Sequence, residues 1–218
     1  MEKISDACLS SSTEDGQQRC AVGDPREDEI LRAAFEEFTE RGFHGATMLA
    51  VAGRARASKA TLYEKFHNKV GLFHALLEWG CRQTMADLRS IVDDVGRDPK
   101  DALADCAARV LMAMGSPPAL ALLRISIAEG ARRPEVGTIY NSLTRDPIVA
   151  FIRQLVERLV ASEAIVIREP EEFGAAFIGL LRGDLFYQAL LGTATPTPED
   201  WERLARRAVA RLLRAFAP

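Results

Sequence analysis

The sequence predicts an all-α fold. No segment shows the period-two alternation of polar and apolar residues that is typical of a half-buried strand, whereas stretches from position 24 onward repeat apolar residues at helical spacing. The chain has 218 residues, of which 48% are hydrophobic, which suffices for one or two domains with a large core. We expect an N-terminal three-helix head with a helix-turn-helix, joined by a long helix to a helical C-terminal domain.

The first helix of the head is expected after a disordered arm. Residues 1–23 are rich in Ser, Asp, Glu, Gln and Gly and have no periodicity. Asp24 and Pro25 then open a helix, with Glu27 near its positive end. Gly42 is expected to end it. Its apolar stripe consists of Ile30, Leu31, Ala34, Phe35 and Phe38.

The helix-turn-helix is predicted from three successive helix caps, spaced about ten residues apart along the chain. Thr47 caps a short helix of about two turns, whose apolar residues Leu49, Val51 and Ala52 are expected to face inward against the first helix. Residues 55–57 can form only a turn. Ser58 caps a second helix, from Lys59 to about Lys65, with Leu62 and Phe66 facing inward, and Asn68 caps a third beginning at Lys69. Two short helices across such a turn have the helix-turn-helix layout.

Charge is concentrated in the same stretch. Residues 44–70 carry five Lys and Arg against the single acid Glu64, a local charge of +4 in a chain of net charge −3. A basic island on an acidic protein indicates a localised contact with a polyanion. The alternative is an ordinary solvated charged face, but the cations coincide with a short, capped helix.

These residues resemble the DNA-binding region of the tetracycline-repressor (TetR) family. The resemblance rests on Gly42-Phe43, on the run Ser-Lys-x-Thr-Leu-Tyr-x-x-Phe-x-x-Lys from Ser58 to Lys69, and on Leu72-Phe73, and it covers roughly residues 27–75. It implies a homodimeric DNA-binding transcriptional regulator that is not an enzyme. One departure is Arg56, where many members have Gly in the turn. It implies backbone strain or a different turn, or equally a further phosphate contact.

The DNA contacts are expected from the helix that Ser58 caps. Lys59, Ala60 and Thr61 stand at its leading end, where recognition helices meet base edges; Lys59 suits guanine and the Ala60 methyl suits the thymine methyl. Tyr63 has a core position beside Leu62 as its alternative. Phosphate contacts are expected from Thr47, Tyr63, Lys65 and Lys69.

The remaining two thirds of the chain is predicted to be helical throughout. A long helix from Lys69 to about Val95 spans about 40 Å and is shared by two cores, so it can act as a lever. Further helices are expected over residues 100–114, 117–130, 135–143, 147–161, 171–191 and 198–216. The resemblance implies that the last two pair with their mates across a two-fold axis, which fits Gly174, Gly179 and Gly183. The alternative is that their wide apolar faces belong only to the internal core.

A ligand site is predicted in this C-terminal domain. Arg124 and Arg182 interrupt apolar helices, and a buried charge needs a partner. Each arginine forms either a structural salt bridge or part of a cavity. The cavity residues would be Met112, Arg124, Tyr140, Phe151, Phe177 and Arg182, and the ligand a small, mainly apolar effector.

Composition argues against several other classes. Four cysteines (Cys8, Cys20, Cys81, Cys106) form no CxxC pair, and the three histidines are not spaced like a zinc site. We expect reduced thiols, no metal and no cofactor, with a redox pair of Cys8 and Cys20 as the alternative. The N-terminus lacks the apolar region of a secretion signal and no apolar run approaches the ~20 residues of a membrane span, so a cytoplasmic protein is expected.

The domains are therefore predicted as a disordered arm (1–23), a helix-turn-helix DNA-binding domain (24–70) and a helical ligand-binding and dimerisation domain (71–218). The expected function is a ligand-responsive repressor that binds a palindromic double-stranded DNA operator as a homodimer. Alternatives are an activator of the same fold and a helical protein-interaction module without specific DNA binding. No catalytic residue is predicted, because the sequence offers no HExxH, ExxH, CxxC or Ser-His-Asp arrangement that supports an assignment to catalysis.

Overall fold

The structure, a computed structural model, describes residues 24–92, 98–161, 163 and 165–216, and over these residues it is helical without a strand. The all-α prediction is confirmed. The predicted arm (1–23) and the predicted end of the long helix at Val95 lie outside the described residues. The helices are α1 (Pro25–Gly45), α2 (Met48–Arg54), α3 (Lys59–Phe66), α4 (Lys69–Val92), α5 (Pro99–Met114), α6 (Pro117–Gly130), α7 (Pro134–Tyr140), the π-helical turn η1 (Asn141–Arg145), α8 (Asp146–Ala161), α9 (Pro170–Leu181), α10 (Asp184–Leu191) and α11 (Pro198–Ala215).

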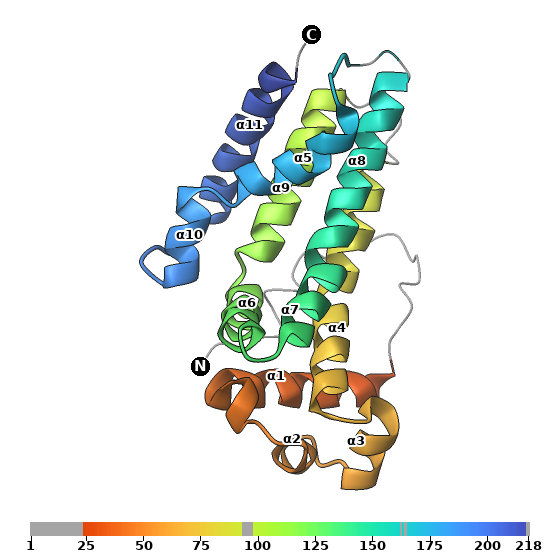
Figure 1. Cartoon of the computed structure of the whole chain (residues 1–218), viewed down its shortest axis with the longest axis vertical. Coiled ribbons are helices and arrows are strands. Elements are labelled where there is room, and N and C mark those ends of the chain that lie inside the picture. Colours follow the sequence, from red (N-terminus) through yellow and green to blue (C-terminus); the bar gives the residue numbers. More distant parts are fainter. Residues whose placement is uncertain (1–23, 93–97, 162, 164, 217–218) are drawn as a thin grey trace, which may run out of the picture.

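The head consists of α1, α2, α3 and the first half of α4, and it lies at one end of the molecule (Figure 1). Its core is built around three phenylalanine rings. The Phe38 ring stacks on Phe43 at a centroid distance of 5.6 Å, and Phe73 of α4 meets both rings edge-on at 5.4 and 5.5 Å. Such edge-to-face pairs are the preferred aromatic geometry, so α4 is fixed to α1 by specific packing.

Helix α1 begins where its sequence indicates, and Gly42, its predicted end, is the site of a kink after which the helix continues to Gly45. The Asp24 carboxylate accepts a hydrogen bond from the Arg26 N–H and caps the first turn. Gly42 has a φ of 67°, which breaks the helical conformation, and the chain then makes one more turn to Gly45. That turn carries Phe43 into the head core.

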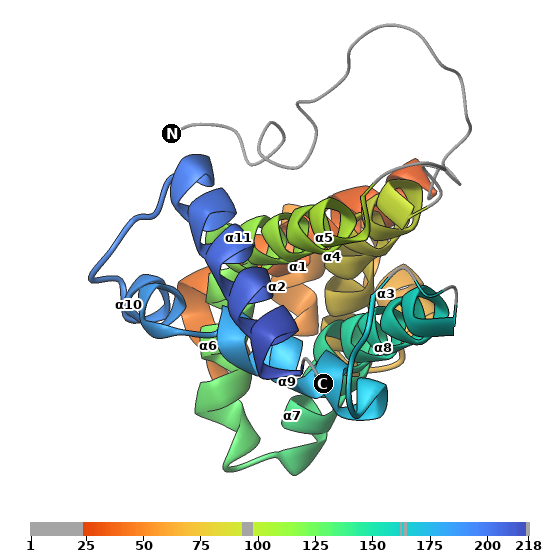
Figure 2. The same cartoon turned by 90° about the horizontal axis from the view of Figure 1, so that it is seen from above.

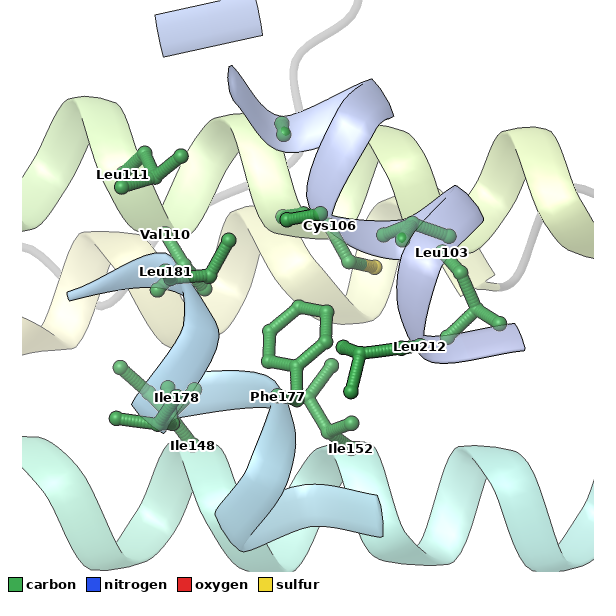
Figure 3. Packing of buried hydrophobic residues seen from close by; sticks show 14 of the residues in the cluster. Leu103, Cys106, Val110, Leu111, Ile148, Ile152, Phe177, Ile178, Leu181 and Leu212 are labelled. Atoms are coloured by element: carbon green, nitrogen blue, oxygen red, sulfur yellow. The ribbon is translucent and has the colours of Figure 1, made fainter. Parts of the chain in front are cut away.

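The body comprises α5 to α11 with the second half of α4, and α4 links it to the head (Figure 1). Phe173 and Phe177 of α9 are fully buried at its centre. Figure 3 shows the Phe177 ring pointing into the space between α5, α8 and α11. Seen from above, α10 lies at the edge of the body, where it packs against α6 (Figure 2).

The predicted single helix over residues 171–191 is wrong. The structure has two helices, α9 and α10, separated by Arg182 and Gly183. Gly183 adopts an extended backbone (φ −71°, ψ −168°), and Asp184 starts the next helix. The apolar pattern continues across the break, because both helices bury one face, so periodicity alone does not reveal the interruption.

Head and body share a continuous seam. Leu122 of α6 and Val136 of α7 are buried in the core of the head, although they lie far beyond it in sequence. Tyr140, the last residue of α7, packs against the cores of both head and body. The head is therefore completed by α6 and α7, and a shift of these helices acts directly on its packing.

Among the described residues, no single helix is long and apolar enough to cross a membrane. Helices α5 and α6 reach that length and composition only as a pair, and the chain bends by 67° between them.

Candidate nucleic-acid interface

The leading end of α3 faces solvent. The Ser58 Oγ accepts a hydrogen bond from the Thr61 N–H at 3.0 Å and lies 2.8 Å from the Thr61 Oγ1. Lys59 and Ala60, in the first turn, are exposed, whereas Leu62 on the opposite face is fully buried in the head core. The predicted cap and the predicted inner face are both confirmed, and together they direct small and cationic side chains outward.

Tyr63 shares the exposed face with Lys59. The Lys59 Nζ lies 5.5 Å from the centroid of the Tyr63 ring, and Tyr63 is 42% exposed. The alternative of a core aromatic residue is therefore wrong. A cation–π contact at i, i+4 holds the two side chains together and leaves the Tyr63 hydroxyl accessible.

Helix α2 adds a polar cap and an unexpected apolar residue to this face. The Thr47 Oγ1 accepts a hydrogen bond from the Ala50 N–H at 3.1 Å, as predicted. Leu49 is 67% exposed, so its predicted place among the inward residues is wrong. The signal was present in the sequence: Met48, Val51 and Ala52 form the i, i+3, i+4 inner face, which leaves Leu49 outside it.

Arg56 holds the turn between α2 and α3 in a left-handed conformation. Its φ is 50°, a region that is costly for residues with a Cβ. The Nη2 of Arg26 on α1 donates a hydrogen bond to the Arg56 carbonyl at 2.6 Å and fixes the turn. The strained-turn alternative is confirmed, and the Arg56 side chain is exposed.

Arg54 belongs to the basic island but is turned toward α1. Its guanidinium binds three acids of that helix, Glu36 at 3.2 Å, Glu37 at 3.2 Å and Glu40 at 2.6 Å. These hydrogen bonds keep the pKa of Glu40 below its usual value and raise the pKa of Arg54. Because the Glu37 side chain is only 1% exposed, Arg54 neutralises a buried charge and ties α2 to α1.

Lys65 and Lys69 also have intramolecular partners that the sequence did not reveal. The Lys65 Nζ lies 2.8 Å from Asp24 and 3.3 Å from Glu27, and its hydrogen bond lowers the pKa of Asp24. The Lys69 Nζ donates to the carbonyls of His44 and Ala46 at 3.0 and 2.9 Å. Burial lowers the pKa of Lys69, whose ammonium also lies 4.9 Å from the centroid of the Phe43 ring.

The spatial charge pattern therefore differs from the count along the sequence. Lys65 and Lys69, from which phosphate contacts are expected, already bind groups at the two ends of α1 through their ammonium groups. Within the part of the chain that the structure describes, Arg56 and Lys59 are the cations of the island whose side chains bind neither a carboxylate nor a backbone carbonyl. They flank the start of α3, so the unpaired positive charge is concentrated at its leading end.

Comparison with known proteins agrees with this geometry. Residues 30–76 match the family model for bacterial regulatory proteins of the tetR family, and residues 101–218 match that for the C-terminal domain of AefR-like transcriptional repressors. The chain belongs to the TetR family. It is a DNA-binding transcriptional regulator, a class of protein that is distinct from enzymes.

Individual relatives match either a part of the chain or most of it. The HTH-type transcriptional activator FasR of Mycolicibacterium smegmatis is 44% identical over 55 residues, a quarter of either chain. An HTH-type transcriptional regulator of Mycobacterium bovis is 26% identical over 187 residues, 83% of this chain and 84% of its own length. The solved structure of the flavonoid-responsive regulator FrrA has a TM-score of 0.70 and 28% identity, and covers 89% of this chain and 98% of that one.

TetR-family regulators bind small molecules and dimerise. Of the six predicted ligand residues, Phe177 belongs to the body core, and Met112, Tyr140 and Phe151 pack against that core. Arg124 is exposed and donates to the carbonyls of Leu190 and Ala189 at 2.7 and 2.9 Å, so it caps α10. Its predicted cavity position is wrong, and the structural alternative holds with carbonyls in place of a carboxylate. Phe177 is fully buried in the body core, and Phe151 packs against that core.

Met112 also borders the surface of the body. It lines an outer groove of about 320 Å³, in which Ile91 of α4, residues of α5 and two charged residues of α11 meet. Burial raises the pKa of Tyr140, and the positive charge of Arg182 opposes that rise.

The three glycines predicted to allow close helix approach have different surroundings. A Cβ on Gly174 would lie 2.5 Å from the Val149 carbonyl oxygen of α8, so Gly174 serves packing within the chain. A Cβ on Gly179 would meet nothing within 4 Å. Gly179 lines a shallow, mainly apolar groove on the outside of α9 and α11, together with Ala176, Leu180, Arg211, Leu212 and Ala215.

Proposed function

We propose that the protein represses transcription as a cytoplasmic homodimer bound to a near-palindromic operator, and that a small, mainly apolar effector releases it. The observation that carries the DNA part is the leading end of α3, which is capped, exposed and free of acidic partners. In a helix-turn-helix protein this end enters the major groove, and two heads about one helical turn (~34 Å) apart read the two half-sites.

The contacts divide into base readout and positioning. Lys59, Ala60 and Thr61 would meet base edges after Ser58 has fixed the first turn. Tyr63, Thr47 and Arg56 surround them and would bind phosphates. Lys65 and Lys69 would orient α1 against α3 and α4, because their ammonium groups are already bound there.

Dimerisation is proposed through the outer face of α9 and α11. The groove around Gly179 is mainly apolar and has space for a partner side chain. Gly179→Arg should leave the monomer folded, because an added Cβ meets nothing within 4 Å and the groove is open to solvent, yet it should disrupt a helix pair across a two-fold axis. Gly179→Ala is the matched control. Analytical ultracentrifugation should show a monomer for Gly179→Arg and a dimer for both the control and the unaltered protein.

The effector response is supported by the seam between head and body. Leu122, Val136 and Tyr140 pack into the head from helices of the body, so a ligand that favours one arrangement of α6 and α7 also favours one arrangement of the head. FrrA, which is similar over most of the chain, is described as flavonoid-responsive. Repression is proposed because the C-terminal domain matches a repressor family model. Activation stays the alternative, because the relative FasR is named an activator.

One experiment tests the proposal as a whole. DNA fragments selected from a random library by the purified protein should share a near-palindromic sequence. In a gel shift, binding to random DNA should weaken steeply between about 50 and 200 mM salt, as counterion release requires. A protein-interaction module would select no common sequence and show no such salt dependence. In vitro transcription from a promoter that contains the selected site then distinguishes repression from activation.

A further inference from the structure

Arg133 brings a positive charge from the body to the edge of the head. It lies between α6 and α7, and these helices pack against α1 and α4 (Figure 1). Its guanidinium carbon lies 6.0 Å from the centroid of the Phe43 ring, and the Nζ of Lys69 lies 4.9 Å from the same centroid. Both distances are typical of cation–π contacts. One aromatic ring of the head therefore contacts a cation from the head and a cation from the body.

The Phe43 ring is a fixed part of the head. It is fully buried, stacks on Phe38 and meets Phe73 edge-on. The same Lys69 ammonium donates to carbonyls at the end of α1, so the ring, the end of α1 and the start of α4 are joined at one point. A contact that holds the ring therefore holds both of these helices.

The backbone of Arg133 is held on the side of the body. Its N–H donates to the Glu129 carbonyl at 2.8 Å, and Pro134 follows it as the first residue of α7. A residue before proline is restricted to extended conformations, and Arg133 has a φ of −134° and a ψ of 83°. Helices α6 and α7 also pack together beside this turn, since a Cβ on Gly130 would lie 4.0 Å from the Gly137 Cα. The guanidinium is thus carried by a well-supported part of the body.

Glu129 supplies the opposite charge. Its side chain is only 8% exposed, and its Oε2 lies 3.9 Å from the Arg133 Nε. Glu135, on the other side of the turn, lies 3.9 Å from the Arg133 Nη1 but is exposed. Because a buried carboxylate without a partner is costly, Glu129 favours the arrangement in which the guanidinium stays between head and body. The contact with Phe43 is thereby supported by a charge of α6.

The apolar contacts of the same boundary are less directional. Leu122 and Val136 are buried in the core of the head, but the hydrophobic effect depends on the area that is buried and not on direction. A guanidinium over a ring restricts the direction from which α6 and α7 approach Phe43. Arg133 therefore adds an angular constraint that these apolar side chains do not supply.

We propose that Arg133 is a positioning residue for operator binding, which holds the Phe43 ring and thereby fixes the angle between head and body. The inference rests on the homodimeric operator binding proposed above. Two half-sites are bound together only if both heads are presented at the matching separation and angle. A fixed angle therefore raises the affinity for the full operator, because less freedom is lost on binding, and leaves the recognition of a single half-site unchanged.

Gel shifts with three DNA duplexes test this. The first is the operator selected from the random library, the second has one base pair inserted between its half-sites, and the third has a single intact half-site. A cation–π contact at a partly exposed site changes an equilibrium by about two- to fivefold, and both heads lose it in Arg133→Met. Affinity for the full operator should fall by about three- to twentyfold. Half-site affinity should stay unchanged, and the discrimination against the inserted base pair should become weaker.

Two further variants make the test specific. Arg133→Lys keeps a cation beside the ring and should retain part of the affinity for the full operator. Arg132→Met is the matched control, because Arg132 is exposed and, among the described residues, forms no ion pair or ring contact. It removes the same charge from the same turn and should leave all three affinities unchanged.

Each other outcome overturns the inference. Equal losses on the full operator and the half-site would show that Arg133 supports the head itself and not its angle. No loss on either DNA, or the same loss in Arg132→Met, would show that the contact with Phe43 positions nothing.

The failure of this inference differs from the failure of the proposed function. If the unaltered protein prefers the full operator to the half-site and Arg133→Met keeps that whole preference, this inference alone is refuted. If the unaltered protein selects no operator, or binds the full operator no better than the half-site, the proposed homodimeric regulator is refuted.

Discussion

The cations of the head fall into two groups with different surroundings. Arg54, Lys65 and Lys69 point toward α1, where acids and backbone carbonyls bind them. Arg56 and Lys59 point away from the head and have no acidic partner there. The first group therefore stabilises the arrangement of the helices, and the second is available to DNA. Nearness in sequence does not reveal which group a cation belongs to, because the partners that bind the first group are supplied by α1 and its two ends.

The largest effect is expected where α3 meets α4, since this junction sets how the DNA-facing group is presented. Gly71→Ala would place a Cβ 2.1 Å from the Phe66 carbonyl oxygen, so α3 must shift. We expect a loss of about 3 kcal/mol or more in the free energy of unfolding, measured by urea denaturation. Gly80→Ala on the same helix meets nothing within 4 Å and should stabilise by up to about 1 kcal/mol. Equal effects of the two substitutions would show that the α3–α4 contact does not constrain the head.

The next effect concerns a cation of the first group. Arg54→Ala removes a partner of the buried Glu37 and should lower the free energy of unfolding by about 1–3 kcal/mol. The folded fraction should retain its operator preference, because Arg54 faces α1. Thermal denaturation and a gel shift on the same sample check both parts. Unchanged stability together with lost operator preference would move Arg54 into the DNA-facing group.

A smaller effect is expected at the turn. Arg56→Gly removes the strain of the left-handed backbone, but glycine also makes the unfolded chain more flexible, which offsets part of the gain. The net effect should be a stabilisation of about 1 kcal/mol. It also removes an unpaired cation, so the slope of log affinity against log salt should become shallower by about one.

Lys69→Met is the matched control for this loss of charge. It removes one positive charge whose ammonium is bound to the carbonyls of α1. Its salt slope should therefore stay close to that of the unaltered protein. If Lys69→Met lowers the slope as much as Arg56→Gly does, the division of the cations into two groups fails.

Features fixed by neighbouring residues were predictable from the sequence. The caps at Asp24, Thr47 and Ser58 act within three residues, and the inner face of α3 follows from Leu62 and Phe66. The sequence was less informative wherever a distant segment decides the outcome. Arg54 and Lys69 have partners on α1. The helical spacing of apolar residues continues on both sides of the break at Arg182. Arg124 donates to carbonyls of α10, more than sixty residues away.

The candidate ligand residues show the same contrast. Charge inside an apolar stretch correctly marked Arg182 as unusual, because its burial leaves a donor without an acceptor. The same signal failed for Arg124, which reaches solvent and caps α10. Aromatic residues at helical spacing, such as Phe177, served the core. The sequence pattern thus identifies charged residues within apolar stretches, whereas the fold determines which of them have hydrogen-bond partners.

The affinity of Lys59→Ala for operator and for random DNA tests the central claim most directly. Lys59 is exposed and forms no ion pair with another described residue, so its truncation removes the contact with the Tyr63 ring but no buried packing. If the leading end of α3 reads bases, gel shifts at fixed salt should show operator affinity falling by about tenfold or more, corresponding to 1–3 kcal/mol, while random-sequence affinity changes little. Equal losses on both DNAs, or no loss on either, would contradict the account.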